Sequence, residues 1–266
     1  MPVLARAFEA LRLALAVASV AALLCGAARG QCVKESPGHT VALVELYTSE
    51  GCDSCPPADK WLSGVGPVLA PNSAIPLSLH VNYWDYLGWK DRFADARLTE
   101  RQQELTRIAK GRVVYTPGVF LNLREFRGWN SAADFHKAVS EVNARPARAA
   151  IRIAQTPRPD GRLAVQARFE LKPDAAAVQP QAYLALYENG LQTVVKAGEN
   201  RGLTLKHDHV VRQLLGPLDF TKGAAEFTGA LAIDPGWRRA NMGVAAFVQD
   251  ASSLGVLQAT AMKLCG

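Results

Sequence analysis

Residues 41–59 read VALVELYTSEGCDSCPPAD, and this stretch decides how the chain begins to fold. Its first seven residues, 41–47, form an almost continuous apolar run rich in β-formers, which is typical of a strand buried on both faces. Residues 48–51 break the run, and Cys52 and Cys55 follow as a C-x-x-C pair. Two prolines come next, and the first turn of a helix accepts proline because its backbone N–H groups are unpaired there. The stretch therefore predicts a strand, a C-x-x-C pair and a helix, in that order.

The residues that follow extend this unit. Apolar side chains continue at helical spacing after the prolines, and we expect the helix to end at Gly64 and Gly66. A second apolar strand is predicted over residues 75–81, so that strand, helix and strand form a parallel βαβ unit. Further along we expect an aromatic loop over residues 82–93, a helix that stops at Gly111, a strand over residues 118–122 and a helix that begins near Ser131.

The second half of the chain has a different apolar period. From about residue 147 the helical spacing gives way to the alternation of half-buried strands, which is strict over residues 163–171. Glu188-Asn189-Gly190 joins two apolar runs and predicts a hairpin between them. We find no helical pattern here, and we expect further strands over residues 208–215, 225–233, 241–249 and 256–264. This half is predicted to be an antiparallel β-sandwich packed against the first half.

Composition limits the classes of function. The chain has 266 residues, 49% of them hydrophobic and 20% charged, which excludes a disordered chain, a collagen-like chain and a polytopic membrane protein. At about 100–200 residues per domain, this length suits one large domain or two ordinary ones. The formal net charge is +6, without a long basic run. Nucleic-acid binding is therefore not predicted, because a phosphate-binding surface gathers its Lys and Arg residues in one place.

The first thirty residues predict export. Arg6 and Arg12 precede an apolar run over residues 13–25, and small residues follow up to Gly30. This order is typical of a secretory signal peptide over residues 1–30 with cleavage after Gly30, and an uncleaved membrane anchor is the alternative. We expect an exported protein, periplasmic or secreted, in an oxidising compartment. Once the signal is cleaved, no association with a membrane is expected.

Cleavage leaves four cysteines, and an even number in an oxidising compartment suggests two disulfides. Cys32 and Cys265 lie close to the two ends of the mature chain, and the ends of a domain are often near each other. We predict a structural disulfide between them; the alternative is that both are free. Because the loop it closes is so long, the loop-entropy model assigns it a nominal stabilisation above about 4.7 kcal/mol.

The C-x-x-C pair is suited to redox exchange, in which one thiolate attacks and a second thiol resolves the mixed disulfide. The start of a helix lowers the pKa of the first cysteine because unpaired N–H groups favour negative charge, whereas the carboxylate of Asp53 works against this effect. Three other interpretations stay open. The pair could be half of a zinc site, although no second half follows; a structural disulfide; or a thiolate pair that handles copper.

A copper chaperone is the main alternative of a different class. Thiolates suit Cu(I), and His80 at the end of the second strand would complete a site with Cys52 and Cys55. His207 and His209 alternate onto one strand face and could bind a metal as well, although two histidines without a third ligand usually only decorate a surface. The sequence has no P-loop, dinucleotide-binding glycine pattern, H-E-x-x-H or G-x-S-x-G motif, so we predict no cofactor.

Residues 48–59 resemble the signature of a bacterial family of exported thioredoxin-like proteins, catalogued as a domain of unknown function (DUF1223). Other segments that fit this family are residues 82–89, Thr116-Pro117, Gly198-Glu199-Asn200 and residues 207–212. The resemblance covers nearly the whole mature chain. It implies an α/β thioredoxin-like domain over residues 36–146 and a C-terminal antiparallel β-sandwich-like domain over residues 147–266, and it brings no established reaction.

The thioredoxin resemblance also implies roles for single residues. Cys52 would be the exposed attacking thiol and Cys55 the resolving thiol. Pro117 would be a cis-proline facing the dithiol, with the backbone of Thr116 able to pair with a substrate strand; the alternative is an ordinary trans proline. Glu45, a carboxylate within an apolar strand, would accept the proton of Cys55, unless it lies at an exposed strand edge or in a salt bridge with a basic residue.

The favoured prediction is an exported thiol–disulfide oxidoreductase that uses Cys52 and Cys55. It would act on protein thiols or disulfides together with an unidentified redox partner. The alternatives are a Cu(I)-binding metallochaperone and a non-catalytic binding module in which the Cys52–Cys55 bridge is a structural disulfide. The aromatic side chains of the loop could form a recognition surface beside the dithiol or cover the protein's own core; they are Tyr83, Trp84, Tyr86 and Trp89.

Overall fold

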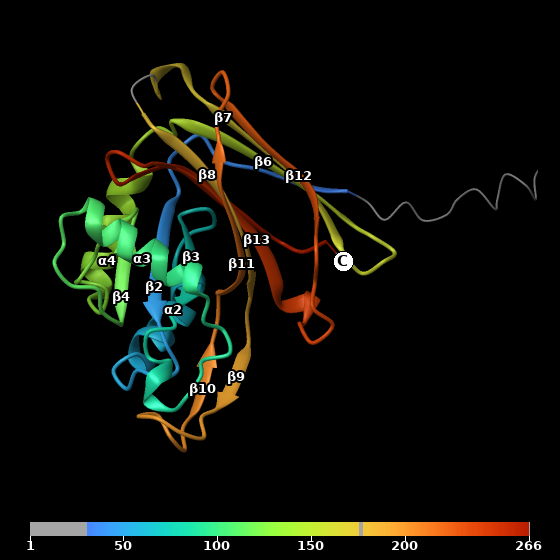
Figure 1. The fold of residues 1–266 in the computed structure, drawn as a ribbon. Coiled ribbons are helices and arrows are strands. Elements are labelled where there is room, and N and C mark those ends of the chain that lie inside the picture. The colour runs from blue at the N-terminus through green and yellow to red at the C-terminus, as the bar shows by residue number, and fades with distance from the viewer. Residues whose placement is uncertain (1–30, 176–177, 266) are drawn as a thin grey trace, which may run out of the picture. The chain divides into compact units, whose positions relative to one another are not determined.

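The computed structural model describes residues 31–175 and 178–265, so the predicted signal peptide lies outside the described residues. Within this part, the strands form an eight-stranded sheet, a four-stranded sheet and a two-stranded ribbon, accompanied by three α-helices. The structure is a mixed α/β fold with large β-sheets (Figure 1). Among the same residues, none of the helices combines the length and the apolar character needed to cross a membrane.

The eight-stranded sheet contains strands from both halves of the chain. Its order is β14-β13-β8-β11-β3-β2-β4-β5. The first half contributes β2 (Ala42–Thr48), β3 (Ala74–His80), β4 (Gly118–Leu121) and β5 (Arg124–Glu125), and the second half contributes β8 (Pro180–Glu188), β11 (Val210–Asp219), β13 (Met242–Asp250) and β14 (Gly255–Lys263). The halves join where β11 pairs in parallel with β3, with Val210 opposite Ser78. The predicted boundary after residue 146 therefore does not divide this sheet.

The opening stretch folds as the predicted βαβ unit. All seven residues of β2 are buried, and β2 and β3 run parallel. Helix α2 (Pro56–Val68) connects them, with Cys55 as its N-cap and prolines at its first positions. Its predicted end at Gly64 and Gly66 is wrong, because the helix continues through both. Glycine costs only about 1 kcal/mol in a helix, and Val65, which is 2% exposed, keeps the apolar face packed.

Helices cover both faces of β2. Leu46 packs in one apolar cluster with α2 and with α4 (Ala132–Asn143), whereas the next residue, Tyr47, packs in another cluster with α3 (Ala96–Ile108). Side chains on a strand alternate between its faces, so the two helical layers are fixed by this alternation. Ser131 caps α4 by accepting a hydrogen bond from a backbone N–H of its first turn, as its position in the sequence predicts.

The second sheet has the order β1-β6-β7-β12. Its strands are β1 (Cys32–Glu35), β6 (Ala149–Pro157), β7 (Leu163–Leu171) and β12 (Ala224–Leu231). Alternate residues of this sheet, such as Ile151 and Val165, pack against Leu184 and Val244 of the large sheet. Described residues beyond position 147 include only short 3₁₀ turns as helical structure, as the strand periodicity of this half predicts.

A disulfide links the two sheets. Cys32 and Cys265 are bonded, with their Cα atoms 6.0 Å apart and a sequence separation of 233, as predicted. Cys32 begins β1, an edge strand of the four-stranded sheet, and Cys265 follows β14, an edge strand of the large sheet. The bond therefore ties the edge of one sheet to the edge of the other.

The ribbon of β9 (Leu191–Val194) and β10 (Thr204–His207) differs from the predicted hairpin. Glu188-Asn189-Gly190 does turn the chain, but β9 pairs with β10 and not with β8. Both edges of β8 are already occupied, by β11 and β13, so no edge is left for β9. The ribbon instead projects beyond the end of the large sheet, next to α2 (Figure 1).

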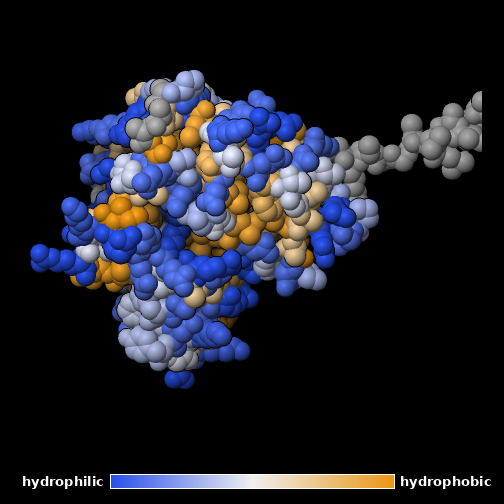
Figure 2. Space-filling view, turned by 45° about the horizontal axis from the view of Figure 1, so that its top comes forward, coloured by the Kyte–Doolittle hydropathy of each residue, from blue (hydrophilic) through white to orange (hydrophobic). Residues whose placement is uncertain are grey.

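Figure 2 shows how hydrophobic and hydrophilic residues are distributed on one face of the molecule. On the face drawn in Figure 2, hydrophobic residues gather toward the middle and hydrophilic residues surround them. In the aromatic loop, Tyr83 and Trp84 pack against the core, and Tyr86 is 80% exposed. The aromatic loop therefore mainly covers the protein's own interior, and it leaves one ring for contact with another molecule.

Candidate functional site

The C-x-x-C pair lies between the end of β2 and the start of α2. Cys52 and Cys55 form a disulfide, with their Cα atoms 5.5 Å apart. Cys55 is the N-cap of α2, and its carbonyl oxygen accepts hydrogen bonds from the backbone N–H groups of Ala58 (2.9 Å) and Asp59 (3.1 Å). The local sequence thus places both sulfurs, which are bonded to each other, at the start of a helix, where unpaired N–H groups favour a thiolate once the disulfide is reduced.

The loop before β4 reaches the same end of the sheet. The Thr116–Pro117 peptide bond is cis, as the resemblance implies. β4 runs antiparallel to β2, with Gly118 opposite Tyr47, so the start of β4 lies beside the end of β2. The cis-proline loop and the C-x-x-C loop therefore lie at one end of the large sheet.

Trp84 lies against both of these loops. Its indole N–H donates a hydrogen bond to Oγ1 of Thr116 at 2.7 Å. On the other side, a Cβ atom added at Gly51 would lie 3.1 Å from the Cβ of Trp84, which is closer than almost all such contacts. Gly51 therefore leaves the space that Trp84 occupies, and the aromatic loop fixes the two loops relative to each other.

The dithiol is covered by the loop that joins β9 to β10, residues 195–203, which we call the covering loop. Cys52 and Cys55 are each 0% exposed, although the two residues between them are exposed. From the covering loop, the amide of Asn200 donates hydrogen bonds to the backbone oxygens of Glu50 (2.9 Å) and Cys52 (2.8 Å). This corrects the prediction of an exposed Cys52. The ribbon of β9 and β10, which lies between β8 and β11 along the chain, carries a loop that covers the sulfurs.

Glu45 lies in the middle of β2 and not beside the C-x-x-C pair. Its carboxylate accepts hydrogen bonds from Arg101 of α3, at 2.7 Å from Nε and 3.3 Å from Nη2, and both side chains are buried. Because side chains alternate along a strand, Glu45 shares the face of Tyr47, toward α3, whereas α2 packs on the other face. This corrects the predicted role of Glu45 as proton acceptor for Cys55, and the salt-bridge alternative describes the residue.

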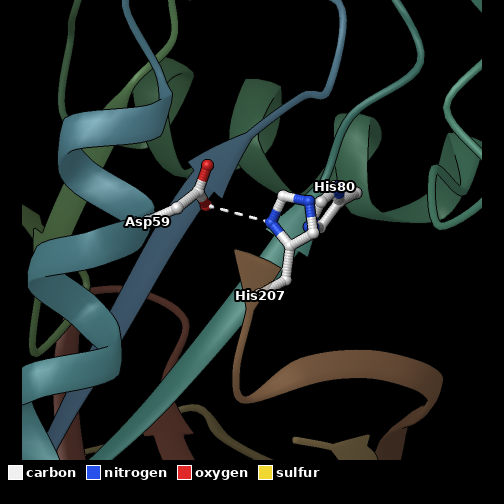
Figure 3. A group of neighbouring side chains, drawn as sticks. All are labelled: Asp59, His80 and His207. Atoms are coloured by element: carbon white, nitrogen blue, oxygen red, sulfur yellow. Dashed lines mark ion pairs between the residues drawn. The ribbon is translucent and has the colours of Figure 1, made fainter. Parts of the chain in front are cut away.

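Three buried side chains with metal-ligating atoms converge beside α2 (Figure 3). Asp59 comes from α2, His80 from the end of β3 and His207 from the end of β10. One ligand atom of each lies within 4.8 Å of the others, and the centroids of the two imidazole rings are 4.9 Å apart. β10 brings His207 here because it lies against α2 and is followed by β11, which pairs with β3.

Asp91 fixes the orientation of the His80 ring through its Nδ1. Nδ1 of His80 lies 2.6 Å from Oδ2 of Asp91, which also accepts a backbone hydrogen bond from Glu50 (2.8 Å). Burial acts to raise the pKa of Asp91, but His80 and the backbone N–H groups outweigh burial and hold this pKa below its usual value. Asp91 is therefore ionised, so Nδ1 of His80 carries the proton of this bond. Nε2 of His80 then points away from Asp91, and it has no hydrogen-bond partner within the described structure.

His207 lies between two carboxylates. Its Nε2 is 3.4 Å from Oε1 of Glu50 and its Nδ1 is 3.8 Å from Oδ1 of Asp59. Burial acts to lower the pKa of His207, but Asp59 and Glu50 outweigh burial and raise this pKa to about 9. The outer oxygens are held by other donors, Trp89 to Glu50 (2.9 Å) and Thr48 to Asp59 (3.1 Å). Both distances to His207 exceed those of good hydrogen bonds, and its ring nitrogens and Oε1 of Glu50 have no hydrogen-bond partner in the part of the chain described.

The structure regroups the metal ligands that the sequence suggested. His80 joins Asp59 and His207, whereas the sulfurs of Cys52 and Cys55 are bonded to each other and do not belong to the group. While Cys52 and Cys55 are bonded to each other, their sulfurs do not form the Cu(I) site with His80 that the sequence offered as an alternative.

The predicted pairing of His207 with His209 is also corrected. The ring of His209 lies near Tyr187, with centroids 6.0 Å apart, whereas His207 lies against His80. His209 has a positive φ of 59°, so the strand alternation on which that pairing depended is interrupted there.

Sequence reasoning missed Glu50, Asp59 and Asp91. A signal existed for Asp59, because it follows Cys55 by four residues in a predicted helix, and side chains four apart share one face. Glu50 and Asp91 carry no comparable spacing. They meet because the aromatic loop folds back onto the end of β2.

One family model matches a range of the chain that includes the whole candidate site. A family model described as "Protein of unknown function (DUF1223)" matches residues 43–249. The chain belongs to this family. The resemblance stated from the sequence is thus confirmed for DUF1223, and the matched range includes the C-x-x-C pair, the covering loop and all three converging side chains. No curated protein matches the chain significantly.

Two solved structures resemble this DUF1223 chain. The X-ray crystal structure of protein AGR_C_4864 from Agrobacterium tumefaciens is 24% identical with a TM-score of 0.60, and the match covers 87% of this chain and 97% of that one. HBP35 of Porphyromonas gingivalis is 15% identical with a TM-score of 0.63, over 86% of this chain and 76% of that one. At these identities the likeness concerns the fold alone.

Proposed function

We propose that this DUF1223 protein is an exported thiol–disulfide oxidoreductase with a thioredoxin-like unit over residues 36–146, in which Cys52 and Cys55 exchange electrons with protein thiols or disulfides. The observation that carries the proposal is the position of the disulfide. It lies at the start of α2, at the end of the sheet that also holds the cis Thr116–Pro117 bond. Such a helix start lowers the pKa of a thiol and favours the reactive thiolate.

Export is supported by two independent features. Residues 1–30 have the charge and apolar pattern of a signal peptide. The chain also carries two disulfides, which persist in oxidising compartments and are rare in the cytosol.

The exchange proceeds in two balanced steps. In the reduced protein, the thiolate of Cys52 attacks one sulfur of a substrate disulfide, so that a mixed disulfide forms and the other substrate sulfur leaves as a thiolate. Cys55 then loses its proton to solvent and attacks the sulfur of Cys52, which releases the second substrate thiolate and forms the Cys52–Cys55 disulfide. The substrate gains two electrons and the protein loses them; the same steps in reverse oxidise a substrate dithiol.

The covering loop has to open before a substrate protein reaches Cys52. Asn200 ties the loop to the backbone oxygens of Glu50 and Cys52, and the backbone N–H of Asp53 donates to Oε2 of Glu199 at 3.2 Å. A hydrogen bond contributes about 0.5–1.5 kcal/mol net. Opening therefore costs a few kcal/mol at these contacts, which thermal motion reaches without unfolding the sheets.

The reduction potential of each disulfide tests the proposal. The mature protein would be equilibrated in a series of redox buffers, its free thiols alkylated, and the four cysteines quantified by mass spectrometry. We expect the Cys52–Cys55 couple above about −300 mV and the Cys32–Cys265 couple below it, because structural disulfides in secreted proteins fall below that value. A Cys52–Cys55 potential as low as that of the terminal pair would overturn the proposal.

The same measurement decides the second candidate, a non-catalytic binding module in which Cys52–Cys55 is structural. The burial of both cysteines at 0% exposure favours it. It predicts a potential below about −300 mV and no exchange with a protein disulfide after reduction.

Opening of the covering loop has its own test in Asn200→Ala. Loss of two hydrogen bonds, about 1–3 kcal/mol in total, should raise the rate at which a dithiol reductant cleaves Cys52–Cys55 by about 5- to 150-fold. Asn143→Ala is the matched control, because Asn143 also donates two hydrogen bonds to backbone oxygens, those of Thr40 and Ser73 (both 2.9 Å), at the opposite end of β2. Equal rates in the two variants would exclude the covering loop as the barrier.

A further inference from the structure

A second site lies within the described residues, separate from the sulfur pair. Asp59, His80 and His207 come from three different elements, α2, β3 and β10, and each is at most 5% exposed. Their ligand atoms lie within 4.8 Å of one another, and in Figure 3 the His207 ring lies next to both the Asp59 carboxylate and the His80 ring. Three ligating side chains do not converge inside an apolar interior without a cost, so the arrangement calls for an explanation.

The converging atoms lack the hydrogen bonds that a buried polar network requires. Nε2 of His80, both ring nitrogens of His207 and Oε1 of Glu50 are buried, and among the described residues none of these atoms has a hydrogen-bond partner. Buried polar atoms in folded proteins are almost always paired. The atoms of His207 and Glu50 have long ion-pair contacts with each other and with Asp59, whereas Nε2 of His80 has none among the described residues, and this atom indicates a partner that is not a side chain of the cluster.

His80 has the orientation of a metal ligand. Asp91 accepts the Nδ1 proton at 2.6 Å, which leaves Nε2 as the nitrogen with a free lone pair. A histidine bound to a metal almost always donates its other ring N–H to a carboxylate or a carbonyl in this way. Asp91 itself accepts hydrogen bonds from the backbone N–H groups of Glu50 and Phe93, so its carboxylate holds the His80 ring in a fixed orientation.

The charges of the cluster also favour a cation. Glu50, Asp59 and Asp91 bring three carboxylates to two imidazoles, and all five side chains are buried. Metal ligation requires both imidazoles to be neutral, so binding displaces any proton that His207 holds between Glu50 and Asp59, and the group then carries three negative charges. A divalent cation compensates two of these charges without a long side chain having to reach the site.

We propose that Asp59, His80 and His207 bind a divalent metal ion of the zinc type, with His207 binding through Nδ1, the ring nitrogen that faces Asp59. Two imidazoles with a carboxylate form a nitrogen and oxygen donor set that suits Zn(II), whereas Cu(I) prefers thiolates. Ligands of a tetrahedral zinc ion lie about 3.4 Å apart. Nδ1 of His207 and Oδ1 of Asp59 lie 3.8 Å apart and all three ligand atoms lie within 4.8 Å of one another, so zinc binding would draw these atoms together. The inference does not depend on the proposed redox activity, because the ligand set contains no sulfur.

Metal content is the first test. The mature protein with both disulfides formed would be stripped with a chelator, dialysed against Zn(II), passed over a desalting column and analysed by mass spectrometry for bound metal. We expect one zinc per chain and a rise in the melting temperature on zinc addition. Less than one tenth of an equivalent, with an unchanged melting temperature, would overturn the proposal.

Variants assign the ligands. His80→Gln, His207→Gln and Asp59→Asn keep the size of each side chain, and each should weaken zinc binding by more than the roughly 10- to 100-fold expected for the outer residue Asp91→Asn. His136→Gln is the matched control, since His136 lies on the exposed side of α4. Cluster variants that bind zinc as tightly as this control would contradict the assignment.

Cobalt substitution tests the site without any variant, so a variant that fails to fold does not leave the question open. Co(II) in the wild-type protein should show the intense visible absorption of a tetrahedral site and no sulfur-to-cobalt charge-transfer band. A charge-transfer band would move the metal to cysteine sulfur, and weak octahedral absorption would place it in a solvent-exposed position. Either spectrum would overturn the proposed ligand set.

Discussion

Glu45 and Glu50 differ although they stand five positions apart on one stretch of chain and are both buried, at 1% and 0% exposed. In the middle of β2, both oxygens of Glu45 accept hydrogen bonds from Arg101. The guanidinium of Arg101 also donates to Gln249 at 3.0 Å and lies over the ring of Tyr183. This part of the molecule is closed: each charge has its counter-charge and its hydrogen bonds.

The end of β2 is different. One oxygen of Glu50 accepts a hydrogen bond from Trp89, and the other has only His207, at 3.4 Å. Around them lie unpaired imidazole nitrogens and two further carboxylates, of Asp59 and Asp91. The same disulfide-bearing loop begins here. The Glu45–Arg101 ion pair has all its hydrogen bonds and needs no role beyond stabilising the fold. The buried cluster beside the C-x-x-C pair has polar atoms without hydrogen bonds, so a ligand or a reaction is to be sought there.

The largest effect is expected from breaking the closed pair. Arg101→Met leaves the carboxylate of Glu45 buried without a counter-charge, so the free energy of unfolding in urea should fall by about 3–5 kcal/mol. The rate of reduction of Cys52–Cys55 and the amount of bound zinc should not change, because Arg101 contacts neither site directly.

The double variant Glu45→Met/Arg101→Met is the control for this prediction. An apolar replacement of a buried ion pair is often neutral, so most of the lost stability should return. If the double variant stays as unstable as Arg101→Met, the cost lies in packing rather than in charge. If Arg101→Met slows the dithiol, Glu45 takes part in its chemistry after all.

The next effect separates the disulfide at the end of β2 from the one that links the sheets. The Cys52–Cys55 bond closes a loop with a sequence separation of 3, and the Cys32–Cys265 bond one of 233. Loop entropy gives about 2 kcal/mol for the short loop and about 5 kcal/mol for the long one. Cys52→Ala/Cys55→Ala should therefore cost at most about 2 kcal/mol in urea unfolding, and Cys32→Ala/Cys265→Ala clearly more.

The two double variants serve as controls for each other. A larger loss for Cys52→Ala/Cys55→Ala would make the short disulfide the main structural one and would favour the binding-module alternative. A small loss means that stability does not explain why the chain keeps this pair.

Much of the fold was predictable because it is local. The strand at residues 41–47, the cap at Ser131 and the strict alternation over residues 163–171 depend on neighbours along the chain, and the structure has β2, α4 and β7 there. The link between Cys32 and Cys265 needed only the rule that the ends of a domain lie close together.

The sequence did not predict which helix covers the face of β2 that carries Glu45. Alternation shows that Glu45 and Tyr47 share a face, but not whether that face meets α2 or α3, because the loop at residues 49–51 resets the direction of the chain before Cys52. The proton-acceptor role predicted for Glu45 depended on that choice, and it was wrong for this reason.

The buried cluster was out of reach for another reason. Asp59, His80 and His207 meet because the ribbon of β9 and β10 leaves the large sheet and because β11 pairs with β3, and both depend on which sheet edges are free. The same event puts the covering loop over Cys52. Edge occupancy is a property of the assembled sheet, and no spacing in the sequence records it.

The last comparison concerns the hydrogen bonds that two tryptophans donate at the end of β2, and its smaller effect is the smallest expected. Trp84→Phe replaces the indole with a smaller aromatic ring and removes the N–H that donates to Thr116 at 2.7 Å, a neutral acceptor. The lost hydrogen bond should lower the free energy of unfolding by about 0.5–1.5 kcal/mol, in addition to a packing loss that Trp89→Phe shares. Trp89→Phe removes the donor to the Glu50 carboxylate at 2.9 Å, and bonds to charged groups contribute about 1.5–3 kcal/mol. Both values come from urea unfolding with an unchanged slope. If Trp84→Phe costs as much as Trp89→Phe or more, the hydrogen bond from Trp89 contributes little to the stability of the buried Glu50 carboxylate. The bond to the charged group would then be worth no more than the bond to the neutral Thr116 hydroxyl.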